Sequence, residues 1–157
     1  MLRIVDQGLI SHVTGRGAYM PWITPLPDGT FIATQHVGAE LGSPDNHAVV
    51  LRSSDGRQFT EEGVASPADD GYAYRAPQIS VVDATDDPRL VMVCTRFETS
   101  GLDQIFDLDA DQAQTGQLCL LWSDDDGRSW SAPQVVPVDL DPARYQWNSA
   151  GQLMQLA

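Results

Sequence analysis

The side chains best suited to chemistry in this 157-residue chain stand at the openings of short apolar runs and in the longer polar segments between them. Arginine can bind a carboxylate through two parallel hydrogen bonds, and a well-placed carboxyl group can act as a general acid or base. Aromatic rings add flat apolar surfaces with polar edges. Such a mixture is what a sugar-binding surface needs, and its members here are Arg16, Tyr19, His36, Glu40, Asp45, Asn46, His47, Asp69, Asp70, Tyr72, Tyr74, Arg75, Arg96, Glu98, Asp103, Tyr145, Trp147 and Asn148.

Short strands must position these side chains. The apolar runs are rich in β-branched and aromatic residues and are bounded by Gly, Pro, Asp and Ser, while no stretch keeps a helical period. The sequence therefore predicts an all-β protein. The expected strands cover residues 3–11, 19–26, 30–37, 48–53, 62–65, 75–82, 89–97, 117–122, 134–138 and 152–156.

The chain contains an internal repeat, because the segments 19–65 and 74–138 follow the same plan. Each opens with an aromatic residue and a proline, AYMPWITPL in the first and YRAPQISVV in the second. An apolar strand, a long polar loop, a strand ending in serine, a glycine turn and a short strand follow. Alternating strand directions would place the long loops on one face and the glycine turns on the other. The acidic loop 100–116 is expected to be solvated.

Composition excludes several classes of partner. Nine basic residues, all of them Arg, stand against 22 acidic ones, and the net charge of −13 disfavours a nucleic acid or an anionic membrane. No window is apolar enough for a membrane helix and no secretory signal is visible, so the chain as given is expected to be cytoplasmic. Cys94 and Cys119 lie in apolar runs and are expected to be buried thiols. We expect no metal and no cofactor.

The two glycine turns resemble a known motif. Residues 123–130, SDDDGRSW, fit the pattern S-x-D-x-G-x-[ST]-W, and residues 53–59, SSDGRQF, are a shorter version with Phe in place of Trp. The motif is identified as the Asp box, or BNR repeat, of the sialidase-like β-propellers. Aspartate accepts N–H groups of the turn, glycine adopts positive φ, and the aromatic ring packs between sheets. The structural residues are Ser123, Asp125, Gly127 and Trp130, with Ser53, Asp55, Gly56 and Phe59.

This resemblance implies a six-bladed β-propeller, in which each four-stranded unit forms one blade. The 157 residues then form the N-terminal part of a single propeller, because two blades cannot close a ring. Residues 2–14 would be the closing outer strand, 15–66 the first blade, 72–139 the second and 143–157 the start of a third. The remaining blades would be the main protein partner, and the fragment alone would be inactive.

Sialidases use an arginine cluster to bind a substrate carboxylate, an Asp as acid/base and a Tyr assisted by a Glu as nucleophile. Their first arginine lies in an F/Y-R-I-P motif, which Tyr74-Arg75-Ala76-Pro77 resembles. The resemblance therefore implies an exo-acting glycoside hydrolase that releases a terminal sialic acid or related acidic sugar, with Arg75 binding the carboxylate. Tyr19 stands where the arginine of the preceding unit is expected. The implied substrate-binding residues are Arg75, Tyr19, Tyr74 and His36.

Two assignments of the acid/base residue are open. If the first unit corresponds to the first blade of the family, the acid/base residue is Asp45, in the short loop GSPDNH. If the unit with Arg75 has that place, it is Asp103 or, less favourably, Asp107. The nucleophilic Tyr and its Glu would belong to later blades.

Each candidate also has a structural interpretation. Arg75 could form an ion pair with Asp69 or Asp70, Asp45 could form a turn, and His36 could be an ordinary strand residue. The alternative functions are a non-catalytic glycan-binding or interaction propeller, or a propeller hydrolase for a different sugar, since Tyr19 in place of arginine suits a neutral substrate. Several aromatic residues could pack between blades rather than on a sugar, namely Trp22, Tyr72, Tyr74 and Trp147.

Overall fold

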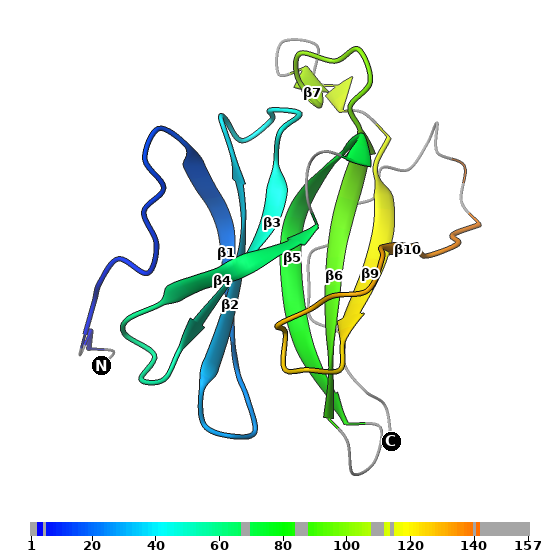
Figure 1. Ribbon diagram of the computed structural model, residues 1–157. Helices are drawn as coiled ribbons and strands as arrows, with labels where there is room; N and C mark the ends of the chain where they lie inside the picture. Colours follow the sequence, from blue (N-terminus) through cyan, green and yellow to red (C-terminus); the bar gives the residue numbers. More distant parts are fainter. Residues whose placement is uncertain are drawn as a thin grey trace.

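Two four-stranded antiparallel sheets make up most of the computed structural model (Figure 1). It describes residues 3, 4, 6–66, 70–83, 88–107, 112, 113, 115–139 and 141, and this part of the chain contains no α-helix. The all-β prediction is therefore confirmed. The first sheet follows the chain, in the order β1 (Gly17–Pro25), β2 (Phe31–Gly38), β3 (His47–Ser53) and β4 (Thr60–Ser66).

The second sheet repeats this order with the second unit of the sequence. It consists of β5 (Tyr72–Asp83), β6 (Pro88–Glu98), β9 (Gln117–Ser123) and β10 (Gln134–Val135). A small ribbon of β7 (Phe106–Asp107) and β8 (Gln112–Ala113) lies within the long loop between β6 and β9. Each repeat predicted from the sequence thus gives one sheet, although β10 is shorter than the strand expected over 134–138.

The main core fills the space between the two sheets. Strand β5, the first of the second sheet, packs against β1, β2 and β3 of the first. Alternate residues of each strand point into this interface, as the period of two requires. The core residues are Leu26, Ile32, Ala48, Val50, Ala65, Tyr74, Ile79, Leu90, Met92, Cys94, Cys119 and Leu121.

The strand expected over residues 3–11 is wrong, since the described residues between 3 and 16 form no strand. They run instead along the face of the first sheet that points away from the second, where Val13 packs on a smaller apolar cluster. Gln35 donates from Nε2 to Ser11 Oγ at 2.8 Å, and the Arg57 guanidinium pairs with Asp6 at 2.9 Å. These are side-chain contacts, and within the described ranges the segment forms no backbone ladder with either sheet.

The two glycine turns share one hydrogen-bonding pattern. Ser123 Oγ accepts the N–H of Gly127 at 2.7 Å and donates to Asp125, whose carboxylate accepts the N–H and hydroxyl of Ser129 at 2.8 and 2.6 Å. In the earlier turn, Ser53 Oγ accepts the N–H of Gly56, and Asp55 accepts two further N–H groups. The hydrogen bonds from Ser129 lower the pKa of Asp125 to about 2. Trp130 then packs on the core between the sheets, whereas Phe59 packs on the outer cluster.

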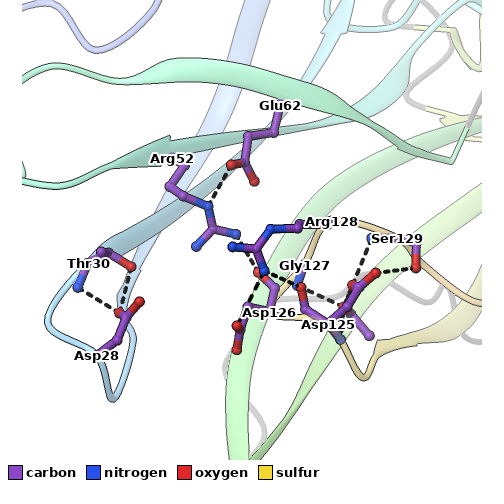
Figure 2. A network of polar contacts seen from close by, with 10 residues as sticks. Asp28, Thr30, Arg52, Glu62, Asp125, Asp126, Gly127, Arg128 and Ser129 are labelled. Carbon is purple, nitrogen blue, oxygen red and sulfur yellow. Dashed lines mark hydrogen bonds and ion pairs between the residues drawn. The ribbon is translucent and has the colours of Figure 1, made fainter.

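Arg52, at the end of β3, links the first sheet to the glycine turn of the second (Figure 2). In Figure 1 the glycine turns lie at the end of the molecule opposite the long loops. Its Nε donates to Glu62 at 2.7 Å and its NH2 donates to the carbonyl oxygen of Asp126. Figure 2 shows this contact joining strand β3 of the first sheet to the turn of the second. The contacts of Arg52 therefore hold the two sheets together at the turn end of the molecule.

Candidate functional site

Matching bulges interrupt the first strand of each sheet at the same place. The pairing of β1 with β2 shifts just after Tyr19, and the pairing of β5 with β6 shifts just after Arg75. The next residues, Met20 and Ala76, have φ angles of 50° and 49°, which side-chain-bearing residues rarely adopt. Such conformations cost about 1–3 kcal/mol each and gather at functional sites. Both bulges lie toward the long-loop end of the sheets.

Arg75 is a buried charge. The residue is 8% exposed, its guanidinium stacks on the ring of Phe106 with 4.1 Å from Cζ to the ring centroid, and its Nε has no hydrogen-bond partner. No carboxylate within the described ranges forms an ion pair with it. Asp70, one of the two partners considered, accepts the hydroxyl of Tyr74 at 2.6 Å instead, and Asp69 lies outside the described residues. Burial lowers the pKa of Arg75 to about 10.

His36 lies between the two bulges. It is fully buried on β2, its ring stacks on Tyr19 with 5.4 Å between the centroids, and its Nδ1 accepts the N–H of Ala76 at 3.3 Å. Because Nδ1 is an acceptor, the ring proton belongs on Nε2, which has no partner. Burial and the charge of Arg75 lower the pKa of His36 to about 3, so the ring is neutral at physiological pH.

Further polar contacts tie β5 to the first sheet. Thr34 donates from Oγ1 to the carbonyl oxygen of Pro77 at 2.7 Å, and Thr24 donates to that of Ile79 at 2.9 Å. The N–H of Tyr74 donates to the carbonyl oxygen of Asn46 at 2.8 Å. The strand that carries Arg75 is thus held by hydrogen bonds from β1, β2 and the β2–β3 loop.

The acid/base candidates have different surroundings. Asp45 accepts the Arg16 guanidinium at 2.6 Å and the N–H of Ala39 at 3.1 Å. Burial alone would raise the pKa of Asp45, but hydrogen bonds with Ser43, Ala39 and Arg16 lower it overall, so this carboxylate is anionic at neutral pH. Asp103 is exposed in the loop between β6 and β7. The choice between the two stays a prediction.

The aromatic candidates also divide. Tyr19 is half-buried, whereas Tyr74 is fully buried in the core between the sheets. Burial and the hydrogen bond to Asp70 raise the pKa of Tyr74 above its usual range. Its ring packs between the sheets, which is the structural alternative to sugar contact. Tyr72 supports the guanidinium of Arg96 at 4.0 Å.

Sequence reasoning missed Phe106, the residue that supports the Arg75 guanidinium. Loop 100–116 was expected to be solvated, and this is wrong for Ile105, which is fully buried and whose N–H donates to the carbonyl oxygen of Gly42 at 2.8 Å. Ile105 and Phe106 pack with Ala73 and Phe97. Two adjacent apolar residues in an acidic loop were the available signal.

Buried polar atoms without partners gather around the bulges. Each such atom costs about 1–3 kcal/mol, and native proteins contain few of them. His36 lies opposite Tyr19, and Ser66 pairs with Ala48, which in turn pairs with His36. The buried polar atoms without partners therefore lie mainly in the half of the molecule that contains the bulges. Within the described ranges the atoms are Trp22 Nε1, His36 Nε2, Asn46 Oδ1, Ser66 Oγ, Arg75 Nε and Gln78 Oε1.

Cys94 and Cys119 are free and buried, as predicted. Among the residues that the structure describes, no group of three or more His, Cys, Asp or Glu side chains is placed to hold a metal ion. The same part of the chain has no helix with the length and apolar character needed to cross a membrane.

Comparisons with known proteins support the fold class. A protein of unknown function from Dyadobacter fermentans DSM 18053 is similar, with a TM-score of 0.65 and 17% identity over 86% of this chain and 40% of that one. An exo-inulinase from Aspergillus awamori, a β-propeller glycoside hydrolase, is similar with a TM-score of 0.50 and 17% identity over 70% of this chain and 25% of that one. No protein-family model matches the sequence, and no curated protein matches it.

These similarities are consistent with an all-β chain that forms part of a β-propeller. The chain spans 40% of the length of the first similar protein and 25% of that of the second. The likeness to a glycoside hydrolase propeller is weak and concerns the fold. The sialidase relationship and the six-bladed count stay predictions.

Proposed function

We propose that this chain carries the carboxylate-binding part of a propeller glycoside hydrolase that releases a terminal sialic acid or related acidic sugar. The observation that supports this proposal most directly is the buried guanidinium of Arg75, which has no carboxylate partner within the described ranges. A buried charge without compensation is costly, and an anionic ligand group would remove that cost. Within this proposal the complete ring has six blades.

The surroundings of Arg75 favour a planar anion. Because one face of the guanidinium lies on Phe106, the donors at its edge are the groups left for a ligand. Edge-on donors match a carboxylate through two parallel hydrogen bonds. Tyr19, at the corresponding bulge of β1, stacks on the buried ring of His36 and adds a half-buried aromatic surface. An acidic sugar combines a carboxylate with a ring that such a surface can contact.

Hydrolysis needs an acid/base group in addition, which we assign to Asp45 or Asp103. The likeness to the exo-inulinase fold favours a hydrolase in general terms. The ion pair with Arg16 favours a second candidate function, a non-catalytic glycan-binding propeller, because a carboxylate with a lowered pKa is a poor proton donor.

Isothermal titration calorimetry with N-acetylneuraminic acid tests the binding step, with its methyl ester as the uncharged comparison. We expect the acid to bind and the ester to bind much more weakly, and we expect Arg75→Gln to lose about 10- to 100-fold in affinity, the value of a hydrogen bond to a charged group. Arg89→Gln is the matched control, since Arg89 is exposed and paired with Asp124 in a glycine turn. Equal affinities for acid and ester, or an unaffected Arg75→Gln variant, would refute the proposal.

Release of a fluorophore from a sialic-acid glycoside, measured on the complete propeller because this chain alone is expected to be inactive, then separates the two candidate functions. Turnover that falls by orders of magnitude in Asp45→Asn or in Asp103→Asn identifies a hydrolase and its acid/base residue. Binding without turnover identifies a glycan-binding propeller.

A further inference from the structure

We propose that His36 is the positioning residue for Arg75, and that its Nδ1 atom fixes the bulge of β5 from which the guanidinium reaches its ligand. This inference rests on the proposed function, because it assumes that Arg75 binds an anion. It assigns to His36 a role different from direct contact with a sugar. Two hydrogen bonds within the bulge and the aromatic ring that holds His36 support this role.

The bulge separates the backbone after Arg75 from its neighbour β6. Register is lost between Arg75 and Gln78, so the peptide groups in between turn toward the first sheet. The N–H of Ala76 donates to His36 Nδ1 at 3.3 Å, and the carbonyl oxygen of Pro77 accepts Thr34 Oγ1 at 2.7 Å. Two side chains of one strand, β2, therefore hold consecutive residues immediately after Arg75.

Strain makes this support necessary. Ala76 has a φ angle of 49° and precedes a proline, and a strained backbone of this kind persists only where the surroundings fix it. If the His36 acceptor is removed, the bulge has one contact fewer to hold the strained residue. The backbone next to Arg75 can then relax, and the guanidinium moves away from its place on Phe106. A displacement of about 1 Å is enough to weaken a binding site substantially.

His36 is in turn held by the other bulge. Its ring stacks on Tyr19, with 5.4 Å between centroids and 30° between the planes. Tyr19 has the same place in the first sheet that Arg75 has in the second, directly before the residue with positive φ. The imidazole of His36 thus connects the two bulges, because it contacts the ring of Tyr19 in the first and the backbone of Ala76 in the second.

The role requires a neutral ring with a free lone pair on Nδ1. The charged and titratable groups that face the imidazole are Arg75 from β5 and Tyr19 from β1. Burial and the positive charge of Arg75 both disfavour the imidazolium form and lower the pKa of His36 to about 3. The acceptor therefore persists across the physiological range. Asparagine can place an oxygen near the same point, whereas phenylalanine keeps a ring for stacking but has no acceptor.

The test compares His36→Phe with His36→Asn, and His12→Phe is the control because His12 is exposed and outside the site. Calorimetry with N-acetylneuraminic acid measures affinity, and NMR-detected hydrogen exchange measures the Ala76 amide. We expect His36→Phe to bind at least 10-fold more weakly and to exchange this amide at least 10-fold faster, while His36→Asn recovers much of both. Unchanged exchange at Ala76 in His36→Phe, or no recovery in His36→Asn, would overturn the inference.

Two further readouts keep the inference separate from the proposed function. If wild type does not bind the probe, the proposed function fails, but exchange at Ala76 still decides whether His36 holds the bulge. If His36→Phe does not fold, the ¹⁵N shifts of the wild-type ring decide instead. A proton on Nε2 and none on Nδ1 between pH 5 and 8 supports the role, whereas a protonated Nδ1 excludes it.

Discussion

Acidification from pH 7 to pH 5 is expected to weaken the fold through His36. The folded protein keeps this ring neutral with a pKa of about 3, whereas an unfolded histidine titrates near 6.5. Below pH 6.5 His36 binds a proton in the unfolded chain but not in the folded chain. The contribution of the neutral His36 to the free energy of unfolding is therefore complete above pH 6.5 and is lost as the pH falls toward 3. Linkage gives a loss of about 2 kcal/mol between pH 7 and 5.

This magnitude depends little on the folded value, because at pH 5 any folded pKa below about 4 leaves the ring neutral. The shifted carboxylates titrate lower. Four carboxylates have lowered pKa values, namely Asp28, Asp45, Asp55 and Asp125. Their contribution to the free energy of unfolding is present above the ordinary pKa of 3.8 and is lost only below it. The window from pH 5 to 7 therefore isolates the histidine from these groups.

Urea unfolding of wild type and His36→Phe at pH 7, 6 and 5 measures the effect. The difference in unfolding free energy between the two proteins should change by about 2 kcal/mol over this range, with wild type losing more. The comparison cancels the titration of every group that the two proteins share. Parallel curves would refute the reasoning, since they would mean that His36 is protonated in the fold or is not buried as the structure shows.

The remaining predictions concern the glycine turns and the thiols. Gly127→Ala should lose at least about 2 kcal/mol in urea unfolding, because φ is +87° and a Cβ would lie 2.5 Å from Cδ1 of Ile32. Gly29→Ala, at +86° with nothing within 4 Å, should lose only about 1 kcal/mol, and equal losses would contradict tight packing of the turn. Burial raises the pKa of both Cys94 and Cys119, so a disulfide reagent should modify neither in native protein and both in denaturant. Rapid native modification of either would contradict their burial.

Local rules explain how much of the fold could be predicted. Two-residue periodicity and glycine or proline turns act over a few residues and can be recognised in the sequence. The pattern occurs twice, and each copy forms one sheet with its strands in sequence order. The strand expected over residues 3–11 failed for the opposite reason. Its apolar residues were suitable for a strand, but a strand also has to pair with a neighbouring strand, and no local rule supplies that partner.

The site was predictable only in part. The aromatic residue and proline that open each repeat singled out Tyr19 and Arg75 in the sequence. The positive φ angles of Met20 and Ala76 were not predictable, because a residue before proline usually adopts an extended conformation. The neutral state of His36 depends on packing between strands 40 residues apart. Such contacts form only when two sheets pack together, so no pattern within one strand can predict them.

The repeat also explains why the two bulges differ in chemistry. The same strained frame presents Tyr19 in one sheet and Arg75 in the other. If both positions carried arginine, a second guanidinium would approach the same buried imidazole, and two like charges in a region of low polarity repel strongly. A tyrosine at the first position avoids this cost and supplies a flat surface that orients the ring of His36. Tyr19 therefore keeps a second positive charge away from His36 and Arg75.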